Sequence, residues 1–99
     1  MTKTSNFLAF DLGAESGRAV LGRFDGEQLT LEETHRFPNG PTRIHDALHW
    51  NVLNLFSEMK QGLAKTIKQS EGGVSAAGLD TWGVDFALLD RAEIGRAHV

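Results

Sequence analysis

Residues 7–18 read FLAFDLGAESGR, and this stretch decides the fold that the rest of the chain must complete. It begins as an apolar run, which is typical of a strand buried on both faces. The run contains Asp11 near its end, and a glycine-framed turn follows from Gly13 to Gly17. Arg18 then opens a second apolar run. The stretch therefore predicts two strands joined by a tight turn that gathers a carboxylate, a hydroxyl, a guanidinium and backbone N–H groups.

Two further segments extend this hairpin into an antiparallel meander. Strands are expected over 6–12, 18–24 and 29–37, with the Asp25–Gly26 turn joining the second strand to the third. In the third strand the residues alternate, and the more apolar set is expected on one face: Leu29, Leu31, Glu33, His35 and Phe37. A proline- and glycine-rich segment then ends the meander.

A helix follows a predicted loop that runs to about residue 50. Asn51 stands where an N-cap belongs. Apolar residues then recur at helical spacing and form one stripe: Val52, Phe56, Met59, Leu63 and Ile67. Two glycines at 72–73 are expected to close the helix, and strands are predicted over 74–80 and 84–89. The pattern is that of an α/β fold with a mixed sheet.

The composition excludes several classes of protein. The chain has 99 residues, of which 40% are hydrophobic and 23% charged, as in an ordinary globular domain or part of one. A net charge of −3 gives no electrostatic reason to expect nucleic acid or an anionic membrane as a partner. There are no cysteines, so disulfides and cysteine-based metal sites are excluded. With no signal-like segment and no apolar run of about 20 residues, a cytoplasmic location is expected.

The turn between the first two strands has the chemistry of a phosphate site. The P-loop and dinucleotide fingerprints are both absent, and the glycines lead into a strand where those motifs lead into a helix. A phosphate would therefore lie against the N–H groups of the turn, with a hydroxyl from Ser16 and a guanidinium from Arg18. Asp11 could hold Mg²⁺, because hard cations prefer carboxylate oxygen. The alternative is an ordinary hairpin whose turn happens to contain these residues.

A second cluster, DTWGVDF at 80–86, has the chemistry of a sugar contact. Asp80 ends an apolar strand as Asp11 does, so both carboxylates are expected at one edge of the sheet. Trp82 offers an apolar face for sugar C–H groups, Gly83 exposes the main chain, and Asp85 could accept hydrogen bonds from hydroxyls. The alternative is a tight turn with a core tryptophan and two solvated acids.

Taken in order, four segments resemble the N-terminal part of the rhamnulokinases, which belong to the FGGY group of carbohydrate kinases. The segments are DLGAESGR, HRFPNGP, the HW-x-V that opens the helix, and GLDTWGVDFALLD, and together they extend from about residue 7 to residue 90. The first motif is shared by many actin-like ATPases, whereas DTWGVDF is narrower. The resemblance implies a ribonuclease H-like (actin-like ATPase) fold that is incomplete in this chain.

The resemblance also implies an activity and a set of site residues. The activity is transfer of the ATP γ-phosphoryl group to the 1-hydroxyl of L-rhamnulose, with ATP and Mg²⁺ as cofactors. Five residues match the ATP-binding loop: Ala14, Glu15, Ser16, Gly17 and Arg18. Gly83 matches a sugar contact, which makes Trp82 and Asp85 neighbours of the sugar, and Asp11 matches the acid near the phosphates and metal.

Two expectations concern the extent of the chain. The family's catalytic aspartate lies beyond residue 99, so no catalytic residue is assigned, and residues 1–92 are interpreted as part of an N-terminal kinase domain. Residues 93–99, EIGRAHV, can be encoded by a common sequencing-adapter sequence, and we interpret them as a non-native tail. The isolated chain is therefore expected to be inactive.

Two other functions compete with this interpretation. One is an actin-like nucleotide-binding module that phosphorylates no sugar, and the other is a kinase for a different ketose. The expected partners are a small sugar and ATP, with no nucleic acid and no membrane, and the oligomeric state is left open. The DTWGVDF motif favours a kinase, because a nucleotide-binding module needs no aromatic–glycine sugar contact.

Overall fold

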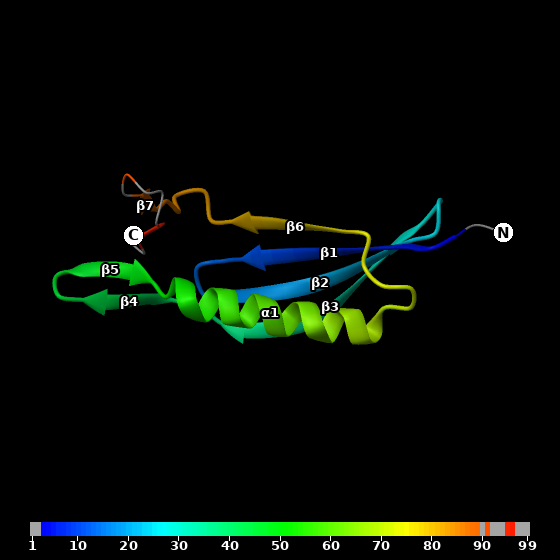
Figure 1. Ribbon diagram of the computed structural model, residues 1–99, viewed down its shortest axis with the longest axis horizontal. Helices are drawn as coiled ribbons and strands as arrows, with labels where there is room; N and C mark the ends of the chain where they lie inside the picture. Colours follow the sequence, from blue (N-terminus) through cyan, green and yellow to red (C-terminus); the bar gives the residue numbers. More distant parts are fainter. Residues whose placement is uncertain (1–2, 90, 92–94, 97–99) are drawn as a thin grey trace.

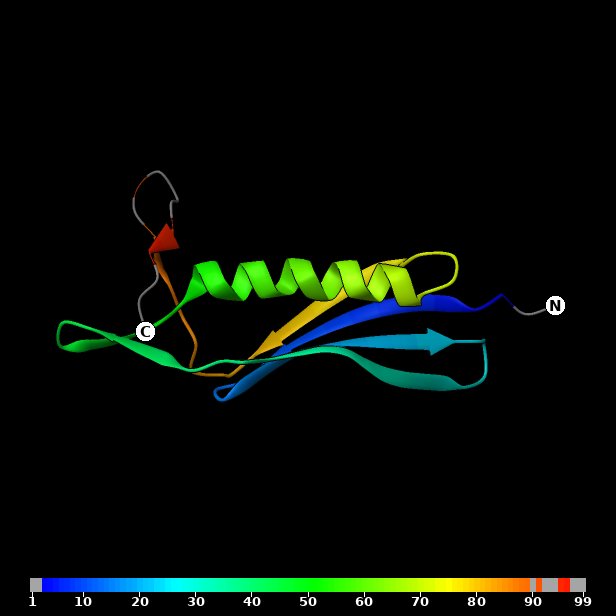
Figure 2. The ribbon, with the colours of Figure 1, turned by 90° about the horizontal axis from the view of Figure 1, so that it is seen from below.

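The computed structural model describes residues 3–89, 91 and 95–96 (Figure 1). Its main body is a four-stranded sheet with one helix lying along one face (Figures 1 and 2). The elements in chain order are β1 (Ser5–Leu12), β2 (Ser16–Phe24), β3 (Leu29–Pro38), β4 (Pro41–Ile44), β5 (Ala47–Trp50), α1 (Val52–Gln69), β6 (Ala76–Thr81), β7 (Leu88–Leu89) and β8 (Gly95–Arg96). The predicted α/β fold with a mixed sheet is confirmed.

The sheet has the strand order β3-β2-β1-β6. The first three strands pair antiparallel, as the meander prediction requires. β6 pairs parallel with β1, which places it at the opposite edge from β3. A parallel pair needs a crossover connection, and the segment containing α1 supplies it. The parallel pairing brings the carboxyl ends of β1 and β6 to the same edge of the sheet.

Helix α1 begins where the sequence predicts. The side chain of Asn51 caps it by accepting a hydrogen bond from the Asn54 N–H at 3.1 Å. The helix ends at Gln69, and Gly72 and Gly73 follow with positive φ angles of 85° and 80°, which glycine adopts without strain. Among the described residues, no helix is long and apolar enough to cross a membrane.

The face of α1 that packs on the sheet differs from the predicted apolar stripe. Gly62 and Thr66 are the buried helix residues, and a Cβ added to Gly62 would lie 3.0 Å from the Cβ of Ala19. These small residues bring the helix close to β2 and β3, where it makes most of its contacts. The predicted stripe is only partly covered, because exposed fractions of 39–58% remain at Val52, Phe56, Leu63 and Ile67. Met59, the remaining member of the stripe, packs against the core cluster, so the stripe lies partly against the sheet and partly exposed.

A β-bulge in β3 divides the residues that were predicted to share one face. Ala19 pairs with His35 but Val20 pairs with Glu33, so Thr34 is an extra residue in the ladder. Beyond the bulge, Phe37 is buried with 3% exposure, whereas Leu29 and Leu31 on the other face are 59% and 69% exposed. The Thr34 hydroxyl instead contacts the Thr66 hydroxyl of α1 at 2.7 Å. The helix face of the sheet therefore has a buried polar contact that a regular alternation would not provide.

Two predicted segments differ in the structure. The expected loop before the helix is a β-hairpin, in which β4 and β5 pair around a turn at His45, whose φ is 56°. The expected strand over 84–89 is reduced to the two residues of β7, which pair with β8. A turn closed by the Asp85 N–H and the Trp82 carbonyl at 2.9 Å redirects the chain before a longer strand can form. Most of the predicted tail at 93–99 lies outside the described residues.

Candidate functional site

The carboxyl ends of β1 and β6 form the floor of the candidate site. Asp11 and Asp80 lie at one edge of the sheet, as predicted, and the parallel register makes them direct partners. An open cleft of about 580 Å³ begins at this edge. Its lining comes from the turn after β1 and from the end of β6: Asp11, Leu12, Gly13, Ala14, Glu15, Ser16, Thr81 and Trp82. The cleft therefore joins the two sequence clusters that were singled out separately.

Some predicted residues line this cleft and others do not. Asp11, Ala14, Glu15 and Ser16 lie on the side that β1 and the following turn form, and Trp82 lies on the other side. The remaining predicted residues are outside the lining: Gly17, Arg18, Gly83 and Asp85. The cleft thus brings together some of the residues predicted for phosphate and metal binding and one of those predicted for sugar binding.

The turn has a tight backbone conformation. The Gly13 N–H donates to the Ser16 carbonyl at 2.9 Å, and a Cβ on Gly13 would lie 3.1 Å from the same carbonyl oxygen. Gly17 is required for a different reason: a Cβ at this position would overlap the ring of Phe37. Gly17 thus makes room for a core aromatic side chain, a packing role that the sequence did not indicate.

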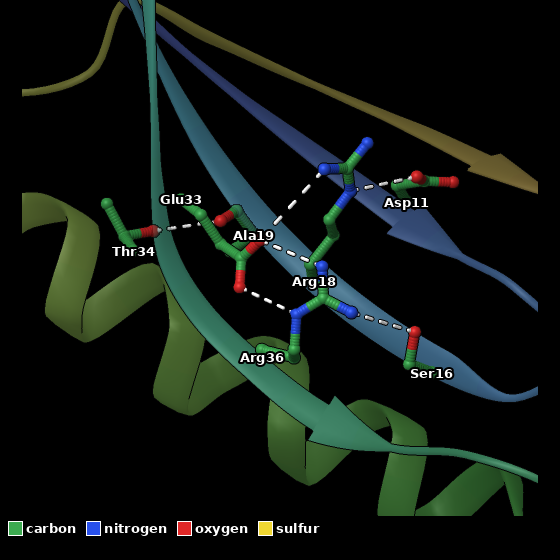
Figure 3. A network of polar contacts seen from close by, with 7 residues as sticks. All are labelled: Asp11, Ser16, Arg18, Ala19, Glu33, Thr34 and Arg36. Atoms are coloured by element: carbon green, nitrogen blue, oxygen red, sulfur yellow. Dashed lines mark hydrogen bonds and ion pairs between the residues drawn. The ribbon is translucent and has the colours of Figure 1, made fainter.

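Arg18 lies on the uncovered face of the sheet, beside the cleft. Its Nε donates to Oδ2 of Asp11 at 3.0 Å, and its Nη1 lies 4.0 Å from Oε2 of Glu33 (Figure 3). Both side chains of the Arg18–Asp11 pair are substantially exposed, at 44% and 40%. An exposed ion pair of this kind is weak, so either group remains available to a ligand.

A second arginine, which the sequence analysis did not identify, joins the same network. Arg36 is the direct cross-strand partner of Arg18, and like charges opposite one another are unfavourable unless they are neutralised. Glu33 supplies the counter-charge through two hydrogen bonds from Arg36, at 2.8 and 3.0 Å. Arg36 also donates to the Ser16 hydroxyl at 3.3 Å (Figure 3). Its placement depends on the strand register, so no local sequence pattern could reveal it.

The pKa values of Asp11 and Asp80 are shifted in opposite directions. The pKa of Asp11 is lowered, first by a hydrogen bond from Asp80 and then by the hydrogen bond from Arg18. The pKa of Asp80 is raised, chiefly because it donates that hydrogen bond to the charged Asp11. As the pH falls, Asp80 therefore takes a proton before Asp11, and Asp11 keeps its negative charge to lower pH.

Asp11 is the residue best suited to a divalent cation. It presents an ionised, partly exposed carboxylate to the cleft, and oxygen ligands of this kind suit Mg²⁺. Among the residues that the structure describes, no group of three or more His, Cys, Asp or Glu side chains could hold a metal ion by itself. A magnesium ion here would need water or ligand phosphate oxygens to complete its coordination, which is usual for Mg²⁺.

The predicted sugar-side residues lie in a less enclosed region. Trp82 is 52% exposed, and a Cβ on Gly83 would meet no atom within 4 Å. Asp85 lines a neighbouring apolar cavity of about 250 Å³, together with Trp50 and Phe86. Oδ1 of Asp85 and Nε1 of Trp50 are both buried without a hydrogen-bond partner among the described residues. Buried polar atoms usually find partners, so this side has unmet hydrogen-bonding capacity.

The chain is similar in sequence to part of a known sugar kinase. No protein-family model matches the chain. Over 86 residues, which is 87% of the chain, the sequence is 42% identical to a rhamnulokinase from Bacteroides thetaiotaomicron. The chain spans only 18% of the length of that relative. The similarity is thus to one portion of a sugar kinase.

Proposed function

We propose that this chain is the N-terminal part of an ATP-dependent sugar kinase. Its reaction would be transfer of the γ-phosphoryl group of ATP to the 1-hydroxyl of L-rhamnulose. The observation that carries the proposal is the single cleft in which the Asp11 carboxylate, the glycine-framed turn and Trp82 meet. The similarity to a rhamnulokinase supports the choice of sugar. The meander, the crossover helix and the parallel fourth strand support part of a ribonuclease H-like fold.

The phosphate side of the cleft is assigned to the nucleotide. Residues 14–18 would bind the ATP phosphates through backbone N–H groups, the Ser16 hydroxyl and the Arg18 guanidinium. Arg18 would exchange its exposed contact with Asp11 for the nucleotide. Asp11 would hold Mg²⁺, which in phosphoryl transfer neutralises charge on the phosphates. The contribution of these residues is positioning and electrostatic stabilisation.

The opposite side of the cleft is assigned to the sugar. Trp82 would stack its exposed ring on sugar C–H groups, and Gly83 would leave the main chain open to a hydroxyl. Asp85 would accept hydrogen bonds from hydroxyls, and its unpartnered carboxylate oxygen supports this role. No residue of this chain is assigned as the base that removes the hydroxyl proton. We therefore expect no turnover by the 99-residue chain alone.

Residues 1–92 would then be the kinase portion, and residues 93–99 a non-native tail. Reading the source DNA across codon 93 tests the second statement. An adapter sequence in place of the parent gene supports it, and a continuous genomic match through Val99 contradicts it.

The test of the proposed activity uses the full-length protein encoded by the parent gene. With Mg²⁺ and ATP present, ADP release is measured against a panel of ketoses that includes L-rhamnulose. Turnover with L-rhamnulose as the preferred sugar is the expected result. Preference for another ketose would overturn the assigned substrate, and nucleotide binding without turnover of any sugar would favour an actin-like nucleotide-binding module.

A further inference from the structure

Asn39, the residue that follows β3, contacts the turn at two points. Its Nδ2 donates to the carbonyl of Gly13 at 2.8 Å. Its backbone N–H donates to the carbonyl of Glu15 at 3.0 Å. The side chain and main chain of one partly buried residue therefore hold two of the carbonyl groups in the phosphate-side turn.

These two contacts also determine where the neighbouring N–H groups point. A trans peptide unit is planar, so the N–H of a residue points opposite to the carbonyl of the residue before it. No described peptide bond is cis. Because the Gly13 and Glu15 carbonyls point toward Asn39, the N–H groups of Ala14 and Ser16 point away from it. An anion-binding turn needs its N–H groups free of the supporting structure in this way.

We propose that Asn39 is a positioning residue for the phosphate-binding turn, an inference that rests on the proposed nucleotide-binding function. Asn39 holds the carbonyls of the turn back, so that the N–H groups of Ala14 and Ser16 are oriented before a phosphate arrives. Orientation in advance lowers the free-energy cost of binding, because the ligand need not order the turn. Asn39 also lines the apolar cavity that contains Asp85, so it lies between the two sides of the site.

The chain offers a matched control at the far end of the same sheet. Asn6 is 4% exposed, and its Nδ2 donates to the carbonyls of Glu71 and Gly73 at 2.8 and 2.9 Å. The chemistry resembles that of Asn39, since a carboxamide holds the carbonyl groups of a connecting segment. The segment that Asn6 holds lies before the start of β6, away from the cleft.

The experiment measures nucleotide binding by the full-length parent protein. Asn39→Ala removes the side-chain donor, and Asn39→Asp keeps the shape but replaces the donor with an acceptor. Each is expected to weaken the Kd for Mg·ADP about tenfold, the effect of losing one orienting hydrogen bond. The KM for ATP should rise in parallel, while kcat and the KM for the ketose stay within about twofold of wild type. Asn6→Ala should lower the melting temperature and leave the Kd unchanged.

The outcomes separate this inference from the proposed function. An unchanged Kd in both Asn39 variants would overturn the inference, as would equal weakening by Asn6→Ala, which would indicate general destabilisation. A wild-type protein that binds Mg·ADP but phosphorylates no ketose overturns the proposed kinase activity alone, and the Kd comparison still decides the role of Asn39. A wild-type protein that binds no nucleotide overturns both.

Discussion

The two sides of the cleft differ in how firmly their backbones are held. On the phosphate side, the turn is fixed by the Gly13–Ser16 hydrogen bond and by two hydrogen bonds from Asn39. On the sugar side, the segment after β6 contains the Asp85–Trp82 backbone hydrogen bond and a longer 3.5 Å contact from the Thr81 hydroxyl. The side assigned to the phosphate is thus held by the residue that follows β3, whereas these contacts on the side assigned to the sugar are local.

This difference indicates how binding free energy would be used. A turn that is already ordered loses little conformational entropy when a phosphate binds. The sugar side follows β6, a strand whose residues are all exposed, and it carries exposed Trp82, Val84 and Phe86. Ordering this segment would consume part of the free energy of sugar binding. Changes on the phosphate side should therefore alter chemistry or folding, and changes on the sugar side should mainly alter sugar affinity.

The largest effect is expected from Asp11→Asn in the full-length protein. The loss of the ionised carboxylate should lower kcat/KM by at least about a hundredfold, because the charge assigned to the metal is removed. Asp80→Asn is the matched control, since it removes the neighbouring acid, which takes a proton first as the pH falls, and leaves the carboxylate of Asp11 in place. Steady-state kinetics at saturating Mg²⁺ measure both. Equal losses in the two variants would contradict the division of roles between the acids.

The next largest effect is expected on folding, from Gly17→Ala. The added Cβ overlaps the Phe37 ring in the core, and overpacking of this kind costs about 1–3 kcal/mol of unfolding free energy. Urea denaturation followed by tryptophan fluorescence measures the loss, since Trp50 is buried. Combining Gly17→Ala with Phe37→Leu should make the two losses less than additive. If the two losses of unfolding free energy were fully additive, the overlap with the Phe37 ring would not be the cause of the loss in Gly17→Ala.

A smaller effect is expected from the glycine on the sugar side. A Cβ on Gly83 meets no atom within 4 Å, so Gly83→Ala should change the unfolding free energy by less than about 0.5 kcal/mol. In the full-length protein the same substitution should raise the KM for the ketose several-fold and leave the KM for ATP unchanged. A loss of stability as large as that of Gly17→Ala would remove the contrast between the two sides.

The smallest effect is expected at the turn between β2 and β3, far from the cleft. The pKa of Asp25 lies below its ordinary value of 3.8 because the N–H groups of Gln28 and Glu27 bond its carboxylate. A depressed pKa stabilises the fold above the unfolded-state pKa, and this stabilisation disappears as the pH falls through the folded-state pKa. Asp25→Asn keeps an acceptor oxygen but removes this titration. Melting temperatures of wild type and variant should therefore converge as the pH is lowered below 3.8. If the difference in melting temperature between wild type and Asp25→Asn did not change with pH, the lowered pKa of Asp25 would not be the source of the stabilisation.

Features fixed by local pattern were predictable from the sequence. The meander follows from alternation and turn residues, and the placement of Asp11 and Asp80 at one edge of the sheet follows because each acid lies near the end of its strand. Asn51 was identified as the helix cap for the same reason, since a cap depends on adjacent residues. The meander and the helix cap depend on residues close together in the sequence, and the shared edge depends only on where each strand ends, so the packing between segments did not need to be known.

Features that depend on packing between segments were not predictable in this way. The helix approaches the sheet through Gly62 and Thr66 as well as Met59 of the stripe, because small residues permit the closest backbone approach. The bulge at Thr34 changes which residues of β3 face the helix, and the extra residue contacts Thr66 of α1. Asn39 and Arg36 reach the site only through the register of β3 against β2, which no local motif encodes.

The uncovered surface of this sheet has a consequence for the chain inside a cell. β6 forms the outer strand at one edge, and its Leu79 is 56% exposed. β3 forms the outer strand at the other edge, and its Leu29 and Leu31 are exposed on the face opposite the helix. An open strand edge beside apolar side chains can add a strand from another molecule, which is the first step of aggregation. Chaperones and proteases recognise the same features. We therefore expect quality control to determine how long this chain persists when it is produced by itself.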